Sequence, residues 1–79
     1  MPNLPHLSGK EIIRALERLG FVQARQRGSH VVMKKSTPEG SVGCVVPLHG
    51  EMAIGTLHSI LKQAKVSRDE FIKSWLSRD

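Results

Sequence analysis

The spacing of apolar residues near the start of the chain predicts an α-helix over about residues 9–19. Ser8 and Glu11 have the spacing of a capping box, in which each side chain accepts a hydrogen bond from the other residue's backbone N–H at a helix start. Gly20, a residue type common just after the last helical turn, would end this helix. Its buried side would be formed by Ile12, Ile13, Leu16 and Leu19.

After Gly20 the pattern changes to short segments rich in β-favouring residues, which predict strands over about residues 21–27, 30–35 and 41–46. Gly28-Ser29 would form a tight turn between the first two strands, and residues 36–40 a loop between the last two. Connections this short favour an antiparallel meander. Side-chain alternation would direct one set of residues toward the core, namely Val22, Ala24, Val31, Met33, Val42, Cys44 and Val46.

The rest of the chain predicts two helices that follow an irregular connection over residues 48–55. Thr56 is a favourable N-cap for the first helix, which would end near residue 64. Ser67 and Glu70 form a second capping box before a short last helix. These elements predict one α+β domain over residues 1–79, with a three-stranded antiparallel sheet, helices on one face of it and a short C-terminal helix.

The sheet face opposite the helices would be open to solvent. Strand alternation places on this face Gln23, Arg25, Arg27, His30, Val32, Lys34 and Gly43. Three cations would then surround one histidine, a side chain that titrates near neutral pH and can act as a general base. Two alternatives to a functional surface stay open at this point. Exposed strands often carry charged residues only for solvation, and a shift of the strand register by one residue would turn His30 toward the core.

Charge and cysteine content narrow the classes of function. The 79 residues include 12 Lys and Arg against 7 Asp and Glu, and the net charge of +5 favours an anionic partner, either nucleic acid or an acidic protein. The single Cys44 excludes an internal disulfide, and the scattered histidines predict no metal site. No apolar run approaches the roughly 20 residues of a transmembrane helix, and the first residues lack a secretory pattern. We therefore expect a cytoplasmic protein without membrane contact or cofactor.

Six short motifs occur in a fixed order along the chain: Ser8-Gly9-Lys10-Glu11, Leu19-Gly20-Phe21, Gly28-Ser29-His30, Val46-Pro47-Leu48-His49-Gly50, Gly55-Thr56-Leu57 and Ile60-Leu61. This order, over about residues 7–72, resembles the HicA (YcfA-like) toxin family of bacterial and archaeal toxin–antitoxin systems. The resemblance implies a fold like that of double-stranded-RNA-binding domains, α-β-β-β-α. It also implies a metal-independent mRNA interferase, an endoribonuclease inhibited by a HicB antitoxin. The catalytic residue that it implies is His30.

The residues present are suited to that chemistry. Metal-free RNA cleavage needs a base that deprotonates the ribose 2′-hydroxyl and an acid that protonates the leaving 5′-oxygen, and the imidazole of His30 fits the role of the base. Nearby cations would stabilise the negative charge that develops on the phosphoryl group. The candidate RNA-binding residues are Gly28, Ser29, Arg25, Arg27 and Lys34.

Several alternatives remain open from the sequence. The general acid is either water or Lys34, and His49 is more readily explained as a loop residue that bonds to the backbone than as a catalytic group. The chain could instead be a non-catalytic double-stranded-RNA-binding module, or a toxin that has lost catalysis and retains only partner binding. We expect a monomer when the protein is free and a hetero-oligomer with the antitoxin, whose acidic surface would cover the face around His30.

Overall fold

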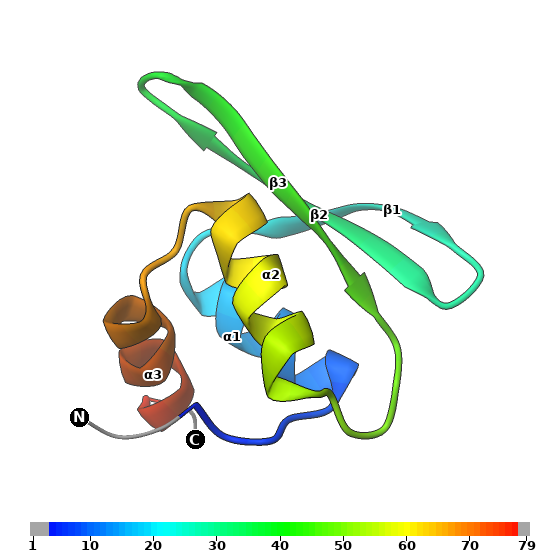
Figure 1. The fold of residues 1–79 in the computed structure, drawn as a ribbon. Helices are drawn as coiled ribbons and strands as arrows, with labels where there is room; N and C mark the ends of the chain where they lie inside the picture. The colour runs from blue at the N-terminus through cyan, green and yellow to red at the C-terminus, as the bar shows by residue number, and fades with distance from the viewer. Residues whose placement is uncertain (1–3, 78–79) are drawn as a thin grey trace.

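In a computed structural model, which describes residues 4–77, helices and strands follow each other in the order α-β-β-β-α-α. The strands form one antiparallel sheet in the order β1-β2-β3, and the helices lie on one side of it (Figure 1). This confirms the predicted α+β class and element order. The elements are α1 (Gly9–Arg18), β1 (Val22–Arg27), β2 (His30–Thr37), β3 (Gly40–Pro47), α2 (Ile54–Ala64) and α3 (Arg68–Leu76).

Local capping signals place the starts of α1 and α3. The Glu11 N–H donates to Ser8 Oγ at 3.2 Å, and the Ser8 N–H donates to Glu11 Oε1 at 3.0 Å. The same pair of bonds joins Ser67 and Glu70. Both predicted capping boxes are therefore confirmed, and each satisfies backbone donors that a helix start leaves without a partner.

The predicted start of α2 is wrong. The helix begins at Ile54, its N-cap is Ala53 without a side-chain bond, and Thr56 lies inside the first turn. The Leu57 N–H already donates to the Ala53 carbonyl at 3.1 Å. Ile54 packs against the core and so extends the apolar stripe of the helix by one turn. This packing places the start of α2 inside the connection over residues 48–55 that was predicted to be irregular.

The hairpin between β2 and β3 is longer than predicted. Both strands continue until only Pro38 and Glu39 remain between them, and the Thr37 hydroxyl donates to the Gly40 carbonyl across the turn at 2.7 Å. Gly40 has a φ of +126°, a region that favours glycine. The predicted loop over residues 36–40 is thus reduced to a two-residue turn.

The core lies between the helix side of the sheet and the helices. Apolar side chains from each layer are buried there: Ile12, Leu16, Val31, Met33, Cys44, Val46, Leu57, Ile60, Leu61 and Phe71. Burial of one large apolar side chain contributes about 1.5–3 kcal/mol. One buried polar contact joins two helices, because the Ser74 hydroxyl on α3 donates to the Ala15 carbonyl on α1 at 2.6 Å. None of the helices in residues 4–77 has the length and hydropathy to cross a bilayer.

Strand β1 departs from the predicted alternation. Its register with β2 shifts between Gln23 and Arg25, which is the mark of a β-bulge at Ala24. Gln23 pairs with the buried Met33 and therefore lies on the helix side, whereas Val22 is 61% exposed and lies on the open side. The predicted inward positions of Val22 and Ala24 and the outward position of Gln23 are wrong. The extra residue in the bulge inverts the alternation upstream of it.

The segment that joins β3 to α2 is bound to the start of α1. The Gly9 N–H donates to the His49 carbonyl at 2.9 Å, and the Met52 N–H donates to the Leu7 carbonyl at 2.7 Å. A Cβ atom at Gly9 would overlap the carbonyl oxygen of Pro47, so only glycine allows this approach. These contacts hold the end of β3, and with it the neighbouring end of β2, in place against α1.

Candidate active site on the open sheet face

The register of the sheet defines three rows of side chains on the open face. Residues that pair directly across antiparallel strands share a face. The three rows, read from β1 to β3, are Arg27-His30-Pro47, Arg25-Val32-Val45 and Val22-Lys34-Gly43. None of these nine positions is an aspartate or a glutamate. The structure thus places Arg25, Arg27, His30, Val32, Lys34 and Gly43 on the face where strand alternation had put them.

His30 lies between Arg27 on one side and Pro47 on the other. It is exposed, as are both arginines of β1. Directly opposite residues have Cβ atoms about 4.5–5.5 Å apart, so the Arg27 guanidinium can reach a group bound at the imidazole. Arg25 lies one row further along, diagonal to His30. One histidine and two cations therefore form a single exposed cluster at one end of the sheet.

Lys34 is placed differently from the two arginines. It follows His30 by four residues on β2, which corresponds to about 13 Å along the strand. Its row also includes Val22 and Gly43, neither of which is charged. The three cations are therefore on one face, but only the arginines adjoin His30.

The turn that precedes His30 is held by two hydrogen bonds. The Gln26 side-chain amide donates to the Gly28 carbonyl at 3.0 Å, and the Leu48 N–H donates to the Ser29 carbonyl at 2.6 Å. Gly28 has a φ of +57°, and no atom lies within 4 Å of where its Cβ would be. Glycine is needed here for the backbone conformation, and the space above the turn is open. Gly28 and Ser29 are both exposed beside His30.

Two further residues with reactive side chains are Cys44, which is buried, and His49, which is exposed. Cys44 faces the core as predicted, and burial raises the pKa of its thiol to about 11, so it is protonated at neutral pH. His49 is exposed, and its backbone carbonyl accepts the Gly9 N–H. Among residues 4–77, no group of three or more histidine, cysteine, aspartate or glutamate side chains is arranged to hold a metal ion.

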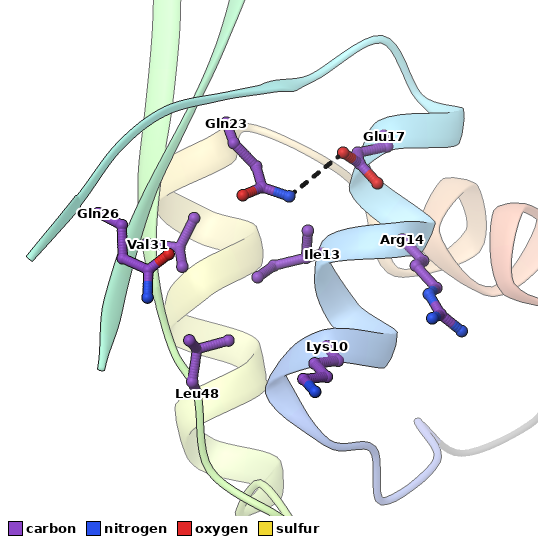
Figure 2. A pocket seen from close by; sticks show the side chains of 8 residues that line it. All are labelled: Lys10, Ile13, Arg14, Glu17, Gln23, Gln26, Val31 and Leu48. Carbon is purple, nitrogen blue, oxygen red and sulfur yellow. Dashed lines mark hydrogen bonds between the residues drawn. The ribbon is translucent and has the colours of Figure 1, made fainter. Parts of the chain in front are cut away.

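A groove on the other side of β1 was not predicted. It lies between α1 and the helix side of β1 and has a volume of about 330 Å³ (Figure 2). Gln26 lies on the helix side by ordinary alternation, and the bulge at Ala24 brings Gln23 onto the same side, so both glutamines line the groove. Sequence reasoning missed this groove because alternation without a bulge separates the two glutamines onto opposite faces.

The fold and the open face define a small basic α+β protein that presents a histidine beside two arginines, a surface suited to an anionic partner. A family model described as the HicA toxin of bacterial toxin–antitoxin systems matches residues 9–66, from the start of α1 to just beyond α2. The chain therefore belongs to the HicA toxin family. It is the toxin of a toxin–antitoxin system, and its partner is an antitoxin. A search of curated proteins found no match.

Proposed function

We propose that this HicA-family toxin is a metal-independent mRNA interferase, an endoribonuclease whose catalytic residue is His30. The observation that carries the proposal is the position of His30, which is exposed on the open face directly opposite Arg27. Membership of the HicA family supports a toxic activity that an antitoxin restrains. Residues 1–79 act as one toxin domain in the cytoplasm, where mRNA is available. Residues 1–3 and 78–79 of this domain lie outside the described residues.

His30 starts the reaction as a general base. Its imidazole removes the proton from a ribose 2′-hydroxyl, and the 2′-oxygen then attacks the adjacent phosphorus. The bond from phosphorus to the 5′-oxygen of the next nucleotide breaks, and that oxygen takes up a proton. A positioned imidazole contributes about 10²–10⁴-fold to the rate by such proton transfer.

The arginines of β1 stabilise the charge that develops on the phosphate. Arg27 is the nearest cation across the sheet from His30, and a guanidinium can bind two phosphate oxygens at once. Arg25 binds beside it. Lys34, about 13 Å along β2, binds a phosphate further along the RNA. This separation disfavours Lys34 as the general acid and favours water, which has free access to the exposed face.

The turn before His30 adds positioning. The Gly28 conformation leaves the space above it open, so the RNA backbone can approach closely. The Ser29 hydroxyl is exposed next to His30 and can donate to a phosphate oxygen. The two hydrogen bonds to the carbonyls of Gly28 and Ser29 keep this turn fixed while substrate binds.

A HicB-like antitoxin inhibits the free monomer by forming a hetero-oligomer in which an acidic surface covers His30 and the arginines. Charge complementarity of this kind makes complex formation fall with added salt. The test measures the affinity of the purified toxin for its purified antitoxin at increasing salt concentration. An affinity that does not depend on salt, or a complex in which His30 reacts with a histidine-modifying reagent as fast as in the free toxin, would contradict this mode of inhibition.

The decisive experiment compares RNA cleavage by the wild type, His30→Ala and His58→Ala. His58 is the matched control because it is an exposed histidine on α2, on the helix side of the sheet. His30→Ala should lower the cleavage rate by about 10²–10⁴-fold. Its thermal unfolding should not change, because His30 is exposed and forms no part of the core. Equal cleavage by His30→Ala and the wild type would refute the proposal, and duplex RNA binding without any product would support a binding module.

A further inference from the structure

The groove between α1 and β1 has the chemistry of a nucleotide site. Its floor is apolar and is formed by Ile13, Val31 and Leu48. Two glutamine side chains line the β1 side, and Lys10 and Arg14 lie on the exposed side of α1 (Figure 2). An apolar floor accepts the face of a base, amides bond to its edge, and cations bind the attached phosphate.

The glutamines are unusual for their position in the sheet. Gln23 and Gln26 pair with the buried Met33 and Val31, on the side where other strands carry core residues. Both glutamines are nevertheless exposed. The bulge at Ala24 places Gln23 on the same side of β1 as Gln26, so that two polar side chains line the groove. A binding role accounts for this arrangement.

Hydrogen bonds hold both amides while leaving groups for a ligand. The Gln23 amide nitrogen donates to Glu17 Oε2 at 3.5 Å, and the Gln26 amide nitrogen donates to the Gly28 carbonyl. Each side chain retains a second N–H and a carbonyl oxygen, the donor–acceptor pair with which amides recognise base edges. Figure 2 shows the Gln23 amide oxygen on the side away from Glu17.

The groove has a polarity that sets the orientation of the nucleotide. Lys10 lies near Leu48 at one end, and Glu17 lies near Gln23 at the other end (Figure 2). Lys10 and Glu17 are separated by about 10 Å along α1, since each helical residue rises 1.5 Å. A phosphate is attracted to the Lys10 end and repelled from the Glu17 end. The base therefore points toward Gln23.

The Lys10 end of the groove adjoins the turn before His30. Leu48 on the floor and Gln26 on the wall bond directly to the carbonyls of Ser29 and Gly28. Gly28 is exposed, and its neighbours in the chain aside, nothing among residues 4–77 lies within 4 Å of where its Cβ would be, so an RNA strand can pass around the turn from the open face into the groove. A phosphate at His30 and a base in the groove then belong to the same short stretch of RNA.

We infer that this groove binds one nucleotide of single-stranded RNA beside the scissile phosphate and contributes to the choice of cleavage site. This inference rests on the proposed ribonuclease function. It predicts that the amides discriminate between bases and that Lys10 strengthens binding, whereas His30 performs the chemistry. A segment of the antitoxin is the competing occupant.

The kinetic test uses Gln23→Ala and Lys10→Ala, with Lys73→Ala on α3 as the matched control for loss of one exposed cation. Cleavage rates are measured at every site of one RNA of mixed sequence. Gln23→Ala should reduce the ratio between the fastest and slowest sites by about five-fold or more, the lower range for a bidentate amide–base contact. Lys10→Ala should raise KM several-fold and leave kcat unchanged, whereas Lys73→Ala should alter neither.

The binding test uses NMR on inactive His30→Ala with a short single-stranded RNA. Addition of the RNA should shift the side-chain amide signals of Gln23 and Gln26. The inference would be overturned if both groove variants kept the site ratios and KM of the wild type, or if RNA left the amide signals unchanged. The ribonuclease proposal would still stand in that case, provided that His30→Ala had lost its activity. Amide signals that move only with antitoxin would overturn it and assign the groove to the partner. If the wild type cleaved no RNA, the proposed function would fail first.

Discussion

Replacement of Gly9 by alanine tests the contact that positions the end of β3. Gly9 is the first residue of α1, and an added Cβ would overlap the Pro47 carbonyl oxygen and lie 3.0 Å from Leu48 Cα. Both neighbours are backbone atoms, so no side chain can rotate to make room. The start of α1 must therefore move away from the segment that follows Pro47.

The expected loss of stability follows from three terms. In a helix interior alanine is more stable than glycine by about 1 kcal/mol, and by less at the first helical position, so this term offsets part of the loss. Overpacking against a fixed backbone costs about 1–3 kcal/mol. Loss of the 2.9 Å bond from the Gly9 N–H to the His49 carbonyl costs about 1 kcal/mol. The free energy of unfolding should fall by about 1–3 kcal/mol, which lowers Tm by roughly 5–20 °C for a protein of this size.

Gly55→Ala supplies the matched control. Gly55 is the second residue of α2, and a Cβ there would meet no atom within 4 Å. The same chemical change should therefore stabilise the protein by a few tenths of a kcal/mol, up to about 1 kcal/mol. Thermal and urea unfolding, followed by circular dichroism, measure both variants. A Gly9→Ala protein as stable as Gly55→Ala would refute the assigned contact between α1 and Pro47.

Other predictions concern the strand faces, the buried thiol and the caps. Val22→Thr should change the free energy of unfolding by less than about 0.5 kcal/mol, because Val22 is 61% exposed; a loss above 1 kcal/mol would contradict the bulge. Stability should fall from pH 9 to 11, since the unfolded Cys44 thiol ionises near 9.0 and the folded one near 11, and Cys44→Ala should flatten that fall in urea titrations. Ser67→Ala should cost about 1 kcal/mol by loss of the α3 cap, whereas Ser59→Ala, at an exposed position of α2, should not. His49→Ala should retain RNA cleavage, because its described contact uses the backbone carbonyl; a 100-fold loss would make it a catalytic candidate.

Signals confined to a few neighbouring residues were predicted correctly. The starts of α1 and α3 depend on reciprocal bonds between residues three apart, as in Ser8 and Glu11, so the motif contains the whole interaction. The same holds for the short turn at Gly28, where the backbone conformation requires glycine. The alternation of β2 also follows from its own residues, because Val31 and Met33 need burial and thereby turn His30 outward.

The features that were mispredicted depend on contacts between distant segments. The start of α2 differs from the prediction because Ile54 packs against the core. No capping side chain in its own segment marks this start. The bulge at Ala24 depends on how β1 pairs with β2, and it turns Val22 outward and brings Gln23 into the groove beside Gln26. Arg25 and Arg27 lie downstream of the bulge, so their predicted face agrees with the structure.

The net charge of +5 and the order of short motifs were enough to indicate a basic toxin of the HicA type, because both depend only on the amino-acid sequence and not on the fold. The arrangement of that charge required the folded sheet. Pairing across strands brought Arg27 beside His30 and left Lys34 about 13 Å away, although all three had been predicted on one face. The groove beside the turn likewise exists only where α1, β1 and Leu48 meet. Local bonding sets where α1 and α3 begin, whereas register and packing set which side chains become neighbours.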